Sequence, residues 1–172
     1  ADAVTLPLLA YNNPGRTGVT LAPETLARLA ENFPHFIGVK DSSAELDDVI
    51  AAMKACPPEF RVFVGREPLL LDALARGAVG GVALTANVIP GLLVRVYDAF
   101  RAGNYAEARA LHVRAAHFRT ELNHIGSYTA QAKAALEMMC LPAGPPRAPI
   151  QPLDEAARAQ LSALLKTVDI TV

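Results

Sequence analysis

The sequence has no tryptophan and only two cysteines among its 172 residues, Cys56 and Cys140. The cysteines form no ligand motif, and their scarcity is typical of a reduced, cytoplasmic protein. The four histidines show no HExxH-type pattern, so nothing in the sequence supports a metal site. An excess of one charge is also lacking, because the net charge is −1. There is therefore no electrostatic case for binding nucleic acid or an anionic membrane.

Long apolar runs and phosphate-binding glycine motifs are missing as well. No apolar run approaches the roughly 18 residues that a membrane helix needs, and no basic-then-apolar signal opens the chain. Neither GxGxxG nor GxxxxGK[ST] follows an expected strand, so the usual nucleotide-binding signatures are absent. What the chain does have is 52% apolar residues, which is enough for a globular domain with a real core.

Short apolar runs alternate with amphipathic stretches through the first hundred residues. We expect strands at 4–11, 36–40, 61–65 and 80–85, each followed by a helix. Ser42 and Glu45 predict a capping box at the start of the second helix. After Gly103 only helices are expected, at 105–122, at 128–141 and after a cap at Asp154. The alternation predicts a parallel sheet, either a small open one or half of a (β/α)8 barrel, whose complete form takes about 250 residues.

Lys40 ends one of these apolar runs, FIGVK at residues 36–40. Desolvating an ammonium is costly unless the charge is paired or neutralised. Gly38 lies on the same face of the strand as Lys40, which predicts open space beside the lysine. A lysine held in this way is a candidate amine nucleophile for a carbonyl group. The alternative is a lysine whose stem lies along the strand end while its charge reaches solvent.

The carboxyl ends of the other strands are where α/β proteins place functional residues. Tyr11 ends the strand next to that of Lys40, about 5 Å away across the sheet, and its phenol can shuttle the protons of Schiff-base formation. Arg16 follows in a turn-rich loop and can bind a carboxylate with two parallel hydrogen bonds. Gly65 and Arg66 end the third strand, where the glycine leaves room for a small substrate. A core tyrosine and a structural arginine are the alternative interpretations.

Three motifs together resemble one family. They are YNNPGRTG at 11–18, GVKDSS at 38–43 and GAVGGV at 77–82, which runs into TANV at 85–88. In these motifs the sequence resembles the pyruvate-dependent class I aldolases, the family of dihydrodipicolinate synthase and N-acetylneuraminate lyase. The resemblance implies an α/β fold, the (β/α)8 TIM barrel, represented by about strands five to eight. Residues 1–102 would form the C-terminal half of the barrel, and residues 103–172 a C-terminal helical extension.

By that resemblance, Lys40 matches the lysine that forms a Schiff base with pyruvate or another 2-keto acid. Tyr11 matches the proton-relay tyrosine, and the Val82 carbonyl falls where the family contacts the bound pyruvyl group. Arg16 matches the arginine that synthases use for the carboxylate of the second substrate. No metal or organic cofactor is implied, because the lysine itself supplies the electron sink.

The resemblance leaves several reactions open. A 4-hydroxy-tetrahydrodipicolinate synthase-like lyase, with an aldehyde as second substrate, is favoured by Arg16. Arg66, where many members have small or acidic residues, offers a second carboxylate contact. Because of Arg66, two other enzyme types of the family remain as alternatives. One is a 4-hydroxy-2-oxoglutarate aldolase, and the other is a keto-deoxy sugar acid aldolase or dehydratase. A non-catalytic keto-acid-binding fragment is a further one, because the family's Gly-Thr-Thr-Gly-Glu loop is absent from these residues. The resemblance also implies a cytoplasmic homotetramer built as a dimer of dimers.

Overall fold

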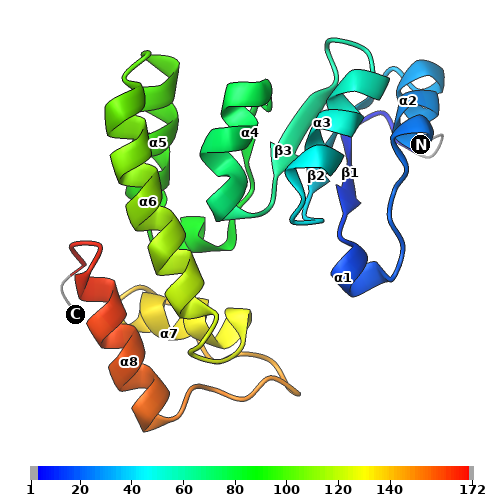
Figure 1. The fold of residues 1–172 in the computed structure, drawn as a ribbon. Helices are drawn as coiled ribbons and strands as arrows, with labels where there is room; N and C mark the ends of the chain where they lie inside the picture. The colour runs from blue at the N-terminus through cyan, green and yellow to red at the C-terminus, as the bar shows by residue number, and fades with distance from the viewer. Residues whose placement is uncertain (1–3, 171–172) are drawn as a thin grey trace. The chain divides into compact units, whose positions relative to one another are not determined.

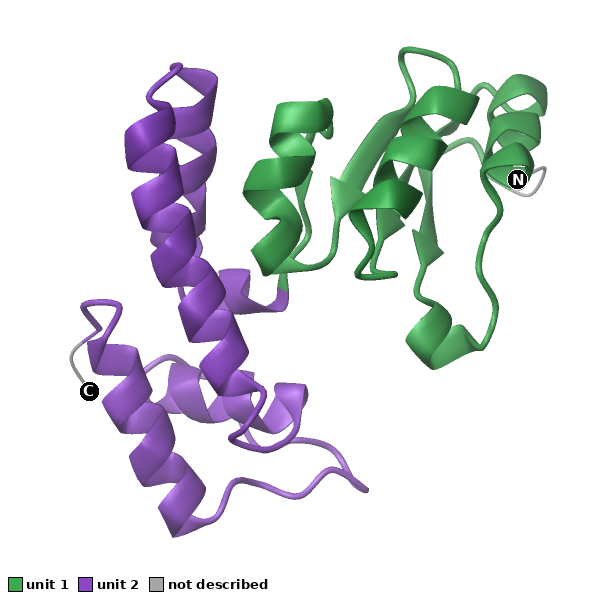
Figure 2. Cartoon of the chain, viewed as in Figure 1, with its two compact units in different colours: residues 1–83 green, residues 84–172 purple. Residues whose placement is uncertain are grey.

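The computed structural model describes residues 4–170, and the chain divides into two compact units, Ala1–Ala83 and Leu84–Val172 (Figures 1 and 2). Among residues 4–170, the four strands belong to the first unit, and the regular elements of the second unit are helices. The domain boundary predicted from the sequence, between residues 102 and 103, marks the end of the strand–helix repeat. It differs from the division between these two units and stays a prediction.

The first unit is a parallel sheet with its strands in the order β1-β2-β3-β4. Every crossover therefore steps one strand in the same direction, and right-handed crossovers of this kind leave all helices on one face. The strands are β1 (Leu8–Asn12), β2 (Phe36–Asp41), β3 (Arg61–Val64) and β4 (Gly80–Gly81). The helices are α1 (Pro14–Thr17), α2 (Pro23–Asn32), α3 (Leu46–Ala55), η1 (Glu67–Leu69) and α4 (Leu70–Arg76) (Figure 1).

The two faces of this sheet differ in how they are covered. The side chains most deeply buried against α2, α3 and α4 are those of Val39, Val62 and Val64. On the opposite face Leu9, Tyr11 and Val82 keep 47%, 51% and 48% of their surface exposed. Because side chains alternate along a strand and Tyr11 pairs with Lys40, both of these predicted catalytic residues lie on this uncovered face.

The first strand is shorter than the predicted 4–11 and begins at Leu8. Proline has no backbone N–H, so Pro7 cannot contribute a donor to the ladder. The first inter-strand bond is accordingly donated by Leu8, from its backbone N to the His35 carbonyl at 2.7 Å. Proline chemistry, visible in the sequence, accounts for the lost residues.

The fourth strand is also shorter than predicted, because 80–85 contains only Gly80–Gly81 as strand. Val82 extends the ladder by one bond, from its backbone N to the Val64 carbonyl at 2.8 Å. The chain then turns into a 3-10 helix, η2 (Leu84–Asn87), in which the Asn87 side chain bonds the Leu84 carbonyl at 2.8 Å. The asparagine thus satisfies the carbonyl of the first residue of this helix.

The predicted capping box of Ser42 and Glu45 is wrong. Helix α3 begins only at Leu46, and Glu45, its N-terminal flanking residue, makes no side-chain capping bond. Ser42 is instead held by a bond from its backbone N to the Asn12 carbonyl at 2.8 Å. Ala44 has φ +80°, an unusual value for a residue with a side chain, and it marks the turn that separates the strand from the helix.

The second unit is built around the long helix α6 (Tyr105–Leu122), which carries fully buried Phe118. The predicted start of a helix after Asp154 is confirmed, since the Asp154 carboxylate accepts a bond from the Ala157 backbone N at 2.8 Å. The other helices of this unit are α5 (Pro90–Arg101), α7 (Tyr128–Met138) and α8 (Glu155–Lys166). None of the helices among residues 4–170 is long and apolar enough to cross a membrane.

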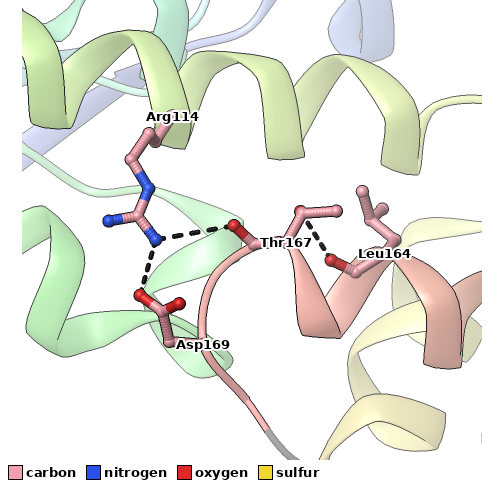
Figure 3. A network of polar contacts seen from close by, with 4 residues as sticks. All are labelled: Arg114, Leu164, Thr167 and Asp169. Atoms are coloured by element: carbon pink, nitrogen blue, oxygen red, sulfur yellow. Dashed lines mark hydrogen bonds and ion pairs between the residues drawn. The ribbon is translucent and has the colours of Figure 1, made fainter.

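Arg114 on α6 forms hydrogen bonds with the segment that follows α8. Its Nη2 donates to Asp169 Oδ2 at 2.7 Å and to the Thr167 carbonyl at 3.5 Å (Figure 3). The Thr167 hydroxyl in turn donates to the Leu164 carbonyl at 2.7 Å, which closes the end of α8 (Figure 3). One guanidinium thereby ties two helices of the second unit together.

Candidate active site

Tyr11 and Lys40 end neighbouring strands and are Cα partners in the β1–β2 ladder. Lys40 Nζ lies 4.3 Å from the centre of the Tyr11 ring. Both side chains belong to the uncovered face, where Lys40 is half-buried and Tyr11 is exposed. The sequence predicts this pair on adjacent strand ends, and the structure places the amine directly over the phenol ring.

The Tyr11 hydroxyl is surrounded by hydrogen-bonding groups. Asn13 Nδ2 donates to its oxygen at 2.7 Å. Burial alone would raise the pKa of the Tyr11 phenol. A hydrogen bond with Ser42, the positive charge of Lys40 and hydrogen bonds with Asn13 and Lys40 outweigh burial and lower the pKa below its ordinary value. The phenol of Tyr11 is therefore a stronger acid here than in a free tyrosine.

Gly65 comes directly after β3 and lies against the side chains of the β2 end. A Cβ at this position would sit 1.9 Å from Ser42 Oγ and 3.0 Å from Lys40 Cε. The Gly65 backbone N bonds the Asp41 carbonyl at 2.6 Å, so the close approach is part of the sheet ladder. Only glycine fits here without displacing the serine hydroxyl or the lysine stem.

A second layer of hydrogen bonds lies on the covered side of the same strand ends. Buried Asn12 donates from Nδ2 to Asp41 Oδ2 at 2.6 Å, and its Oδ1 accepts from the Leu21 backbone N at 3.0 Å. Asp41 Oδ1 accepts from Ser43 N at 3.0 Å and from Ser43 Oγ at 2.5 Å. Asn12 and Asp41 immediately follow Tyr11 and Lys40, so this layer holds the register of the pair.

The predicted space beside Lys40 at Gly38 is not open. A Cβ on Gly38 would lie 2.2 Å from the Arg61 carbonyl oxygen and 2.7 Å from Leu9 Cδ2. The glycine therefore permits close packing of protein atoms, and the prediction of open space there is wrong. Inter-strand register decides which atoms face a glycine, and a single strand's sequence does not contain it.

The remaining predicted site residues are spread along the strand ends. Arg16 is exposed in the short helix α1, and no hydrogen bond or ion pair joins its side chain to another residue among those described. Arg66 is half-buried and precedes η1. Val82 follows β4 on the uncovered face. Of the six predicted residues, the structure brings Tyr11, Lys40 and Gly65 together.

Sequence reasoning missed Asn13 as a donor to the Tyr11 hydroxyl, and Ser42 as the residue that packs against Gly65 beside the Lys40 stem. Ser42 was expected to cap a helix, and Asn13 to be one of several turn formers. A usable signal existed in the period-two alternation, because Ser42 and Asn13 stand two residues beyond Lys40 and Tyr11 and so continue the same faces. Within residues 4–170, no group of three or more His, Cys, Asp or Glu side chains is arranged to hold a metal ion.

The arrangement combines an amine with an adjacent acid–base group on an accessible sheet face. A lysine amine can add to a carbonyl carbon, and a phenol beside it can supply and recover the protons of that addition. Asn13 donates to the phenol oxygen, while Gly65 lets the lysine stem and the serine hydroxyl pack side by side. These are the components required for imine formation.

Comparison with known sequences identifies close relatives of the chain. The 4-hydroxy-tetrahydrodipicolinate synthase of Methanopyrus kandleri is 38% identical over 174 aligned positions, covering 99% of this chain and 56% of that protein. The synthase of the same name from Methanoculleus marisnigri is 37% identical over 161 positions, covering 93% of this chain and 55% of that protein. The chain therefore spans just over half the length of these curated relatives.

Solved structures give the same result. A prophage protein of the dihydrodipicolinic acid synthase family from E. coli K12, in complex with pyruvate, superposes with a TM-score of 0.92 at 28% identity over 98% of this chain and 58% of that one. The 4-hydroxy-tetrahydrodipicolinate synthase of Methylacidiphilum fumariolicum SolV gives a TM-score of 0.90 at 31% identity, with 98% and 56% covered. The model of the dihydrodipicolinate synthetase family matches residues 1–168, and the chain belongs to that family.

Proposed function

We propose that this chain carries the Schiff-base lysine and the proton-relay tyrosine of a pyruvate-dependent lyase or synthase. Lys40 is the nucleophile and Tyr11 the acid–base group. The observation that carries this proposal is the position of Lys40 Nζ, 4.3 Å from the Tyr11 ring centre at the ends of two paired strands. Membership of the dihydrodipicolinate synthetase family supports it, as does the pyruvate complex of the E. coli relative.

The chemistry follows from these two side chains. The neutral Lys40 amine adds to the C2 carbonyl of pyruvate, and the phenol of Tyr11 gives a proton to the oxygen that leaves as water. The resulting iminium withdraws electrons from C3, which loses a proton to form an enamine. The enamine carbon attacks the carbonyl of a second substrate, and water then hydrolyses the imine and releases Lys40. The reverse sequence breaks the same carbon–carbon bond.

Substrate contacts in this proposal come from the neighbouring strand ends. The Val82 carbonyl and Gly65 border the pyruvyl group, while Arg16 binds a carboxylate of the second substrate. Exposure of Arg16, together with the lack of a side-chain partner among residues 4–170, leaves its guanidinium available for such an anion. An acidic aldehyde is accordingly the proposed second substrate, as in a 4-hydroxy-tetrahydrodipicolinate synthase.

A second reaction is favoured by one observation, the half-buried Arg66 beside Gly65. A second arginine near the keto acid suits a substrate that carries carboxylates at both ends, such as a 4-hydroxy-2-oxoglutarate, or an acidic sugar derivative. Condensation of pyruvate with an acidic semialdehyde, measured beside cleavage of 4-hydroxy-2-oxoglutarate and of keto-deoxy sugar acids, separates these candidates. Binding of keto acids without turnover in any of the three assays would identify the non-catalytic alternative.

We also propose that the four strands are strands five to eight of a (β/α)8 barrel. Their sequential parallel order, their helices on one face and the exposed apolar side chains on the other are supporting features. Coverage of 55–58% of the first relatives and neighbours agrees with this share of a barrel. Residues 1–102 would then form the C-terminal half of the barrel, and residues 103–172 the C-terminal helical extension. The homotetramer and the cytoplasmic location are proposals from the resemblance alone.

Borohydride trapping tests the proposed chemistry in the full-length protein. Incubation with pyruvate and borohydride converts a Lys40 imine into a stable carboxyethyl amine, which peptide mass spectrometry locates. We expect the adduct on the peptide containing Lys40 and none after Lys40→Arg. Exposed Lys54 on α3 is the matched control, and Lys54→Arg should leave the adduct in place. Absence of an adduct on Lys40 in the unmodified protein would refute the proposal.

A further inference from the structure

The Asn13 side chain contacts the Tyr11 hydroxyl directly. Its amide nitrogen, Nδ2, lies 2.7 Å from the phenol oxygen, within the normal range of a hydrogen bond. An asparagine Nδ2 carries two hydrogens and accepts no bond, so Asn13 is the donor and the phenol oxygen is the acceptor. The hydrogen of Tyr11 therefore points away from Asn13. It stays available to a group that reacts on the uncovered face of the sheet, where the tyrosine is exposed.

Both ends of this hydrogen bond are held by the backbone. Asn13 is buried, and its carbonyl accepts bonds from the backbone N of Arg16 at 2.9 Å and from the backbone N and the Oγ1 of Thr17, both at 3.0 Å. Pro14 disfavours a helical backbone at the residue before it, and Asn13 has the non-helical angles φ −145° and ψ 74°. Tyr11 is held by its place in the β1–β2 ladder. None of these contacts uses the Asn13 side chain, so the phenol is the partner of its amide.

The neighbouring Asn12 serves the opposite face of the sheet. Its Nδ2 donates to Asp41 Oδ2 at 2.6 Å, and its Oδ1 accepts from the Leu21 backbone N at 3.0 Å. Because side chains alternate along an extended chain, Asn13 continues the face of Tyr11 and Asn12 does not. The two adjacent asparagines thus have separate roles, and only Asn13 reaches the phenol.

We propose that Asn13 is a positioning residue for Tyr11, because its amide donates to the phenol oxygen and leaves the tyrosine hydrogen to the reacting groups. The consequence for catalysis rests on the proposed function. When Tyr11 gives its proton to the departing oxygen, the phenolate that remains keeps the bond donated by Asn13. This bond is also among the causes that lower the pKa of the phenol, which agrees with donation by the amide. Asn13 thus makes Tyr11 a stronger acid without touching the substrate.

The first test measures the ionisation of Tyr11 and requires no pyruvate. Phenolate absorbance is titrated with pH, and the contribution of Tyr11 is isolated by subtracting the titration of Tyr11→Phe. We expect Asn13→Ala to raise the titration midpoint by roughly half a unit to one unit, the equivalent of one lost hydrogen bond. Asn13→Asp keeps the shape of the side chain but replaces the donor with a negatively charged acceptor, so it should raise the midpoint further.

The order of these midpoints separates positioning from a merely structural role. Loss of loop structure would raise the midpoint to the same extent in both variants, whereas loss of a donor places Asn13→Asp above Asn13→Ala. Asn32→Ala is the matched control, because exposed Asn32 at the end of α2 donates from Nδ2 to the Arg28 carbonyl, and the midpoint should stay unchanged. Lys40, whose charge also acts on the phenol, is retained in every variant.

Two outcomes of the titration overturn the inference. One is a midpoint that Asn13→Ala leaves unshifted or lowers, and the other is an Asn13→Asp midpoint that does not exceed that of Asn13→Ala. The backbone bonds of Asn13 are independent of its side chain. Where one variant still fails to fold, the other decides, because each has its own expected shift from the parent protein.

Trapping keeps this inference separate from the proposed function. With borohydride and increasing pyruvate, Asn13→Ala should still form the Lys40 adduct, at a maximal rate several-fold lower at neutral pH. The pyruvate concentration that gives half of this rate should stay unchanged, because Asn13 acts on the acid and not on the substrate. A raised half-maximal concentration with an unchanged maximal rate would place Asn13 in pyruvate binding and overturn the positioning role.

The two failures are distinguishable. An adduct in the parent protein, together with an unshifted Tyr11 in Asn13→Ala, overturns the role of Asn13 and leaves the proposed function intact. A Tyr11 midpoint that rises in the expected order, without any adduct in the parent protein, refutes the proposed function and upholds the positioning of Tyr11 by Asn13.

Discussion

Asn12 donates a hydrogen bond of 2.6 Å to the buried carboxylate of Asp41, one residue beyond the Tyr11–Lys40 pair. This contact joins β1 to β2 through side chains at the point where the backbone ladder is about to end. The same carboxylate accepts two bonds from Ser43, which shapes the turn leading out of β2. A buried carboxylate therefore fixes the strand ends that present the amine and the phenol.

Replacement of Asp41 by alanine should destabilise the protein and disturb the site together. Three donors would lose their buried acceptor, and we expect the free energy of unfolding to fall by roughly 2–4 kcal/mol. Trapping of pyruvate on Lys40 should slow, because the register of β1 and β2 is no longer held. Chemical denaturation followed by circular dichroism gives the first quantity. Asp47→Asn, at an exposed position on α3, is the control and should change stability by less than about 0.5 kcal/mol.

Replacement of Arg16 by alanine should weaken binding of the acidic second substrate and spare imine formation. A charge-assisted bidentate contact of this kind corresponds to about a 10- to 100-fold rise in KM. Steady-state kinetics with an acidic semialdehyde measures this change, and borohydride trapping with pyruvate alone measures the imine. Arg28→Ala, at an exposed position on α2, is the control. An unchanged KM in Arg16→Ala would remove Arg16 from the substrate site.

Local patterns in the sequence predicted much of this fold. Strand–helix alternation predicted a parallel sheet, and the position of Asp154 predicted a helix start that the structure confirms. Adjacent strand ends also predicted the pairing of Tyr11 with Lys40. These features depend on residues close in the sequence or on the general geometry of parallel sheets.

The predictions that were wrong concern residues whose neighbours come from distant parts of the sequence. Ser42 has a suitable residue three positions later for a capping box, yet its hydroxyl lies against Gly65 at the end of another strand. Gly38 and Gly65 were both expected to leave open space at the strand ends. Instead, the space that a Cβ would occupy is filled by atoms of Leu9 at Gly38 and of Ser42 at Gly65. Inter-strand register selects these partners, and no pattern within one segment encodes it.

Phe118 on α6 should be the most costly single truncation in the second unit. Its side chain is fully buried, whereas Val113 on the same helix is 59% exposed. Phe118→Ala removes a large apolar group and leaves a cavity, so we expect a loss of about 3–5 kcal/mol in the free energy of unfolding. Val113→Ala is the control and should stay within about 0.5 kcal/mol of the parent protein. Thermal and chemical unfolding followed by circular dichroism measure both, and equal losses would contradict the assigned core.

The charge of Lys40 should also have a measurable effect on the pKa of Tyr11. Its positive charge, 4.3 Å from the ring centre, is one of the causes that lower the pKa of the phenol. Lys40→Met keeps the length of the side chain but removes the charge, so the titration midpoint of Tyr11 should rise toward its ordinary value. Lys54→Met, which removes an exposed charge on α3, should have no such effect. A midpoint that is the same in Lys40→Met and the parent would mean that the amine does not act on the phenol.

The lowered pKa of Tyr11 should make the free energy of unfolding depend on pH. Because the pKa of the folded-state phenol lies below that of the unfolded chain, ionised Tyr11 favours the folded protein. The contribution is fully present above the unfolded pKa and is lost as the pH falls through the folded pKa. Comparison of Tyr11→Phe with the parent protein by chemical denaturation should therefore show a stability difference that grows in favour of the parent as the pH rises through the alkaline range. A difference independent of pH there would show that the phenol ionises alike in the folded and unfolded chains.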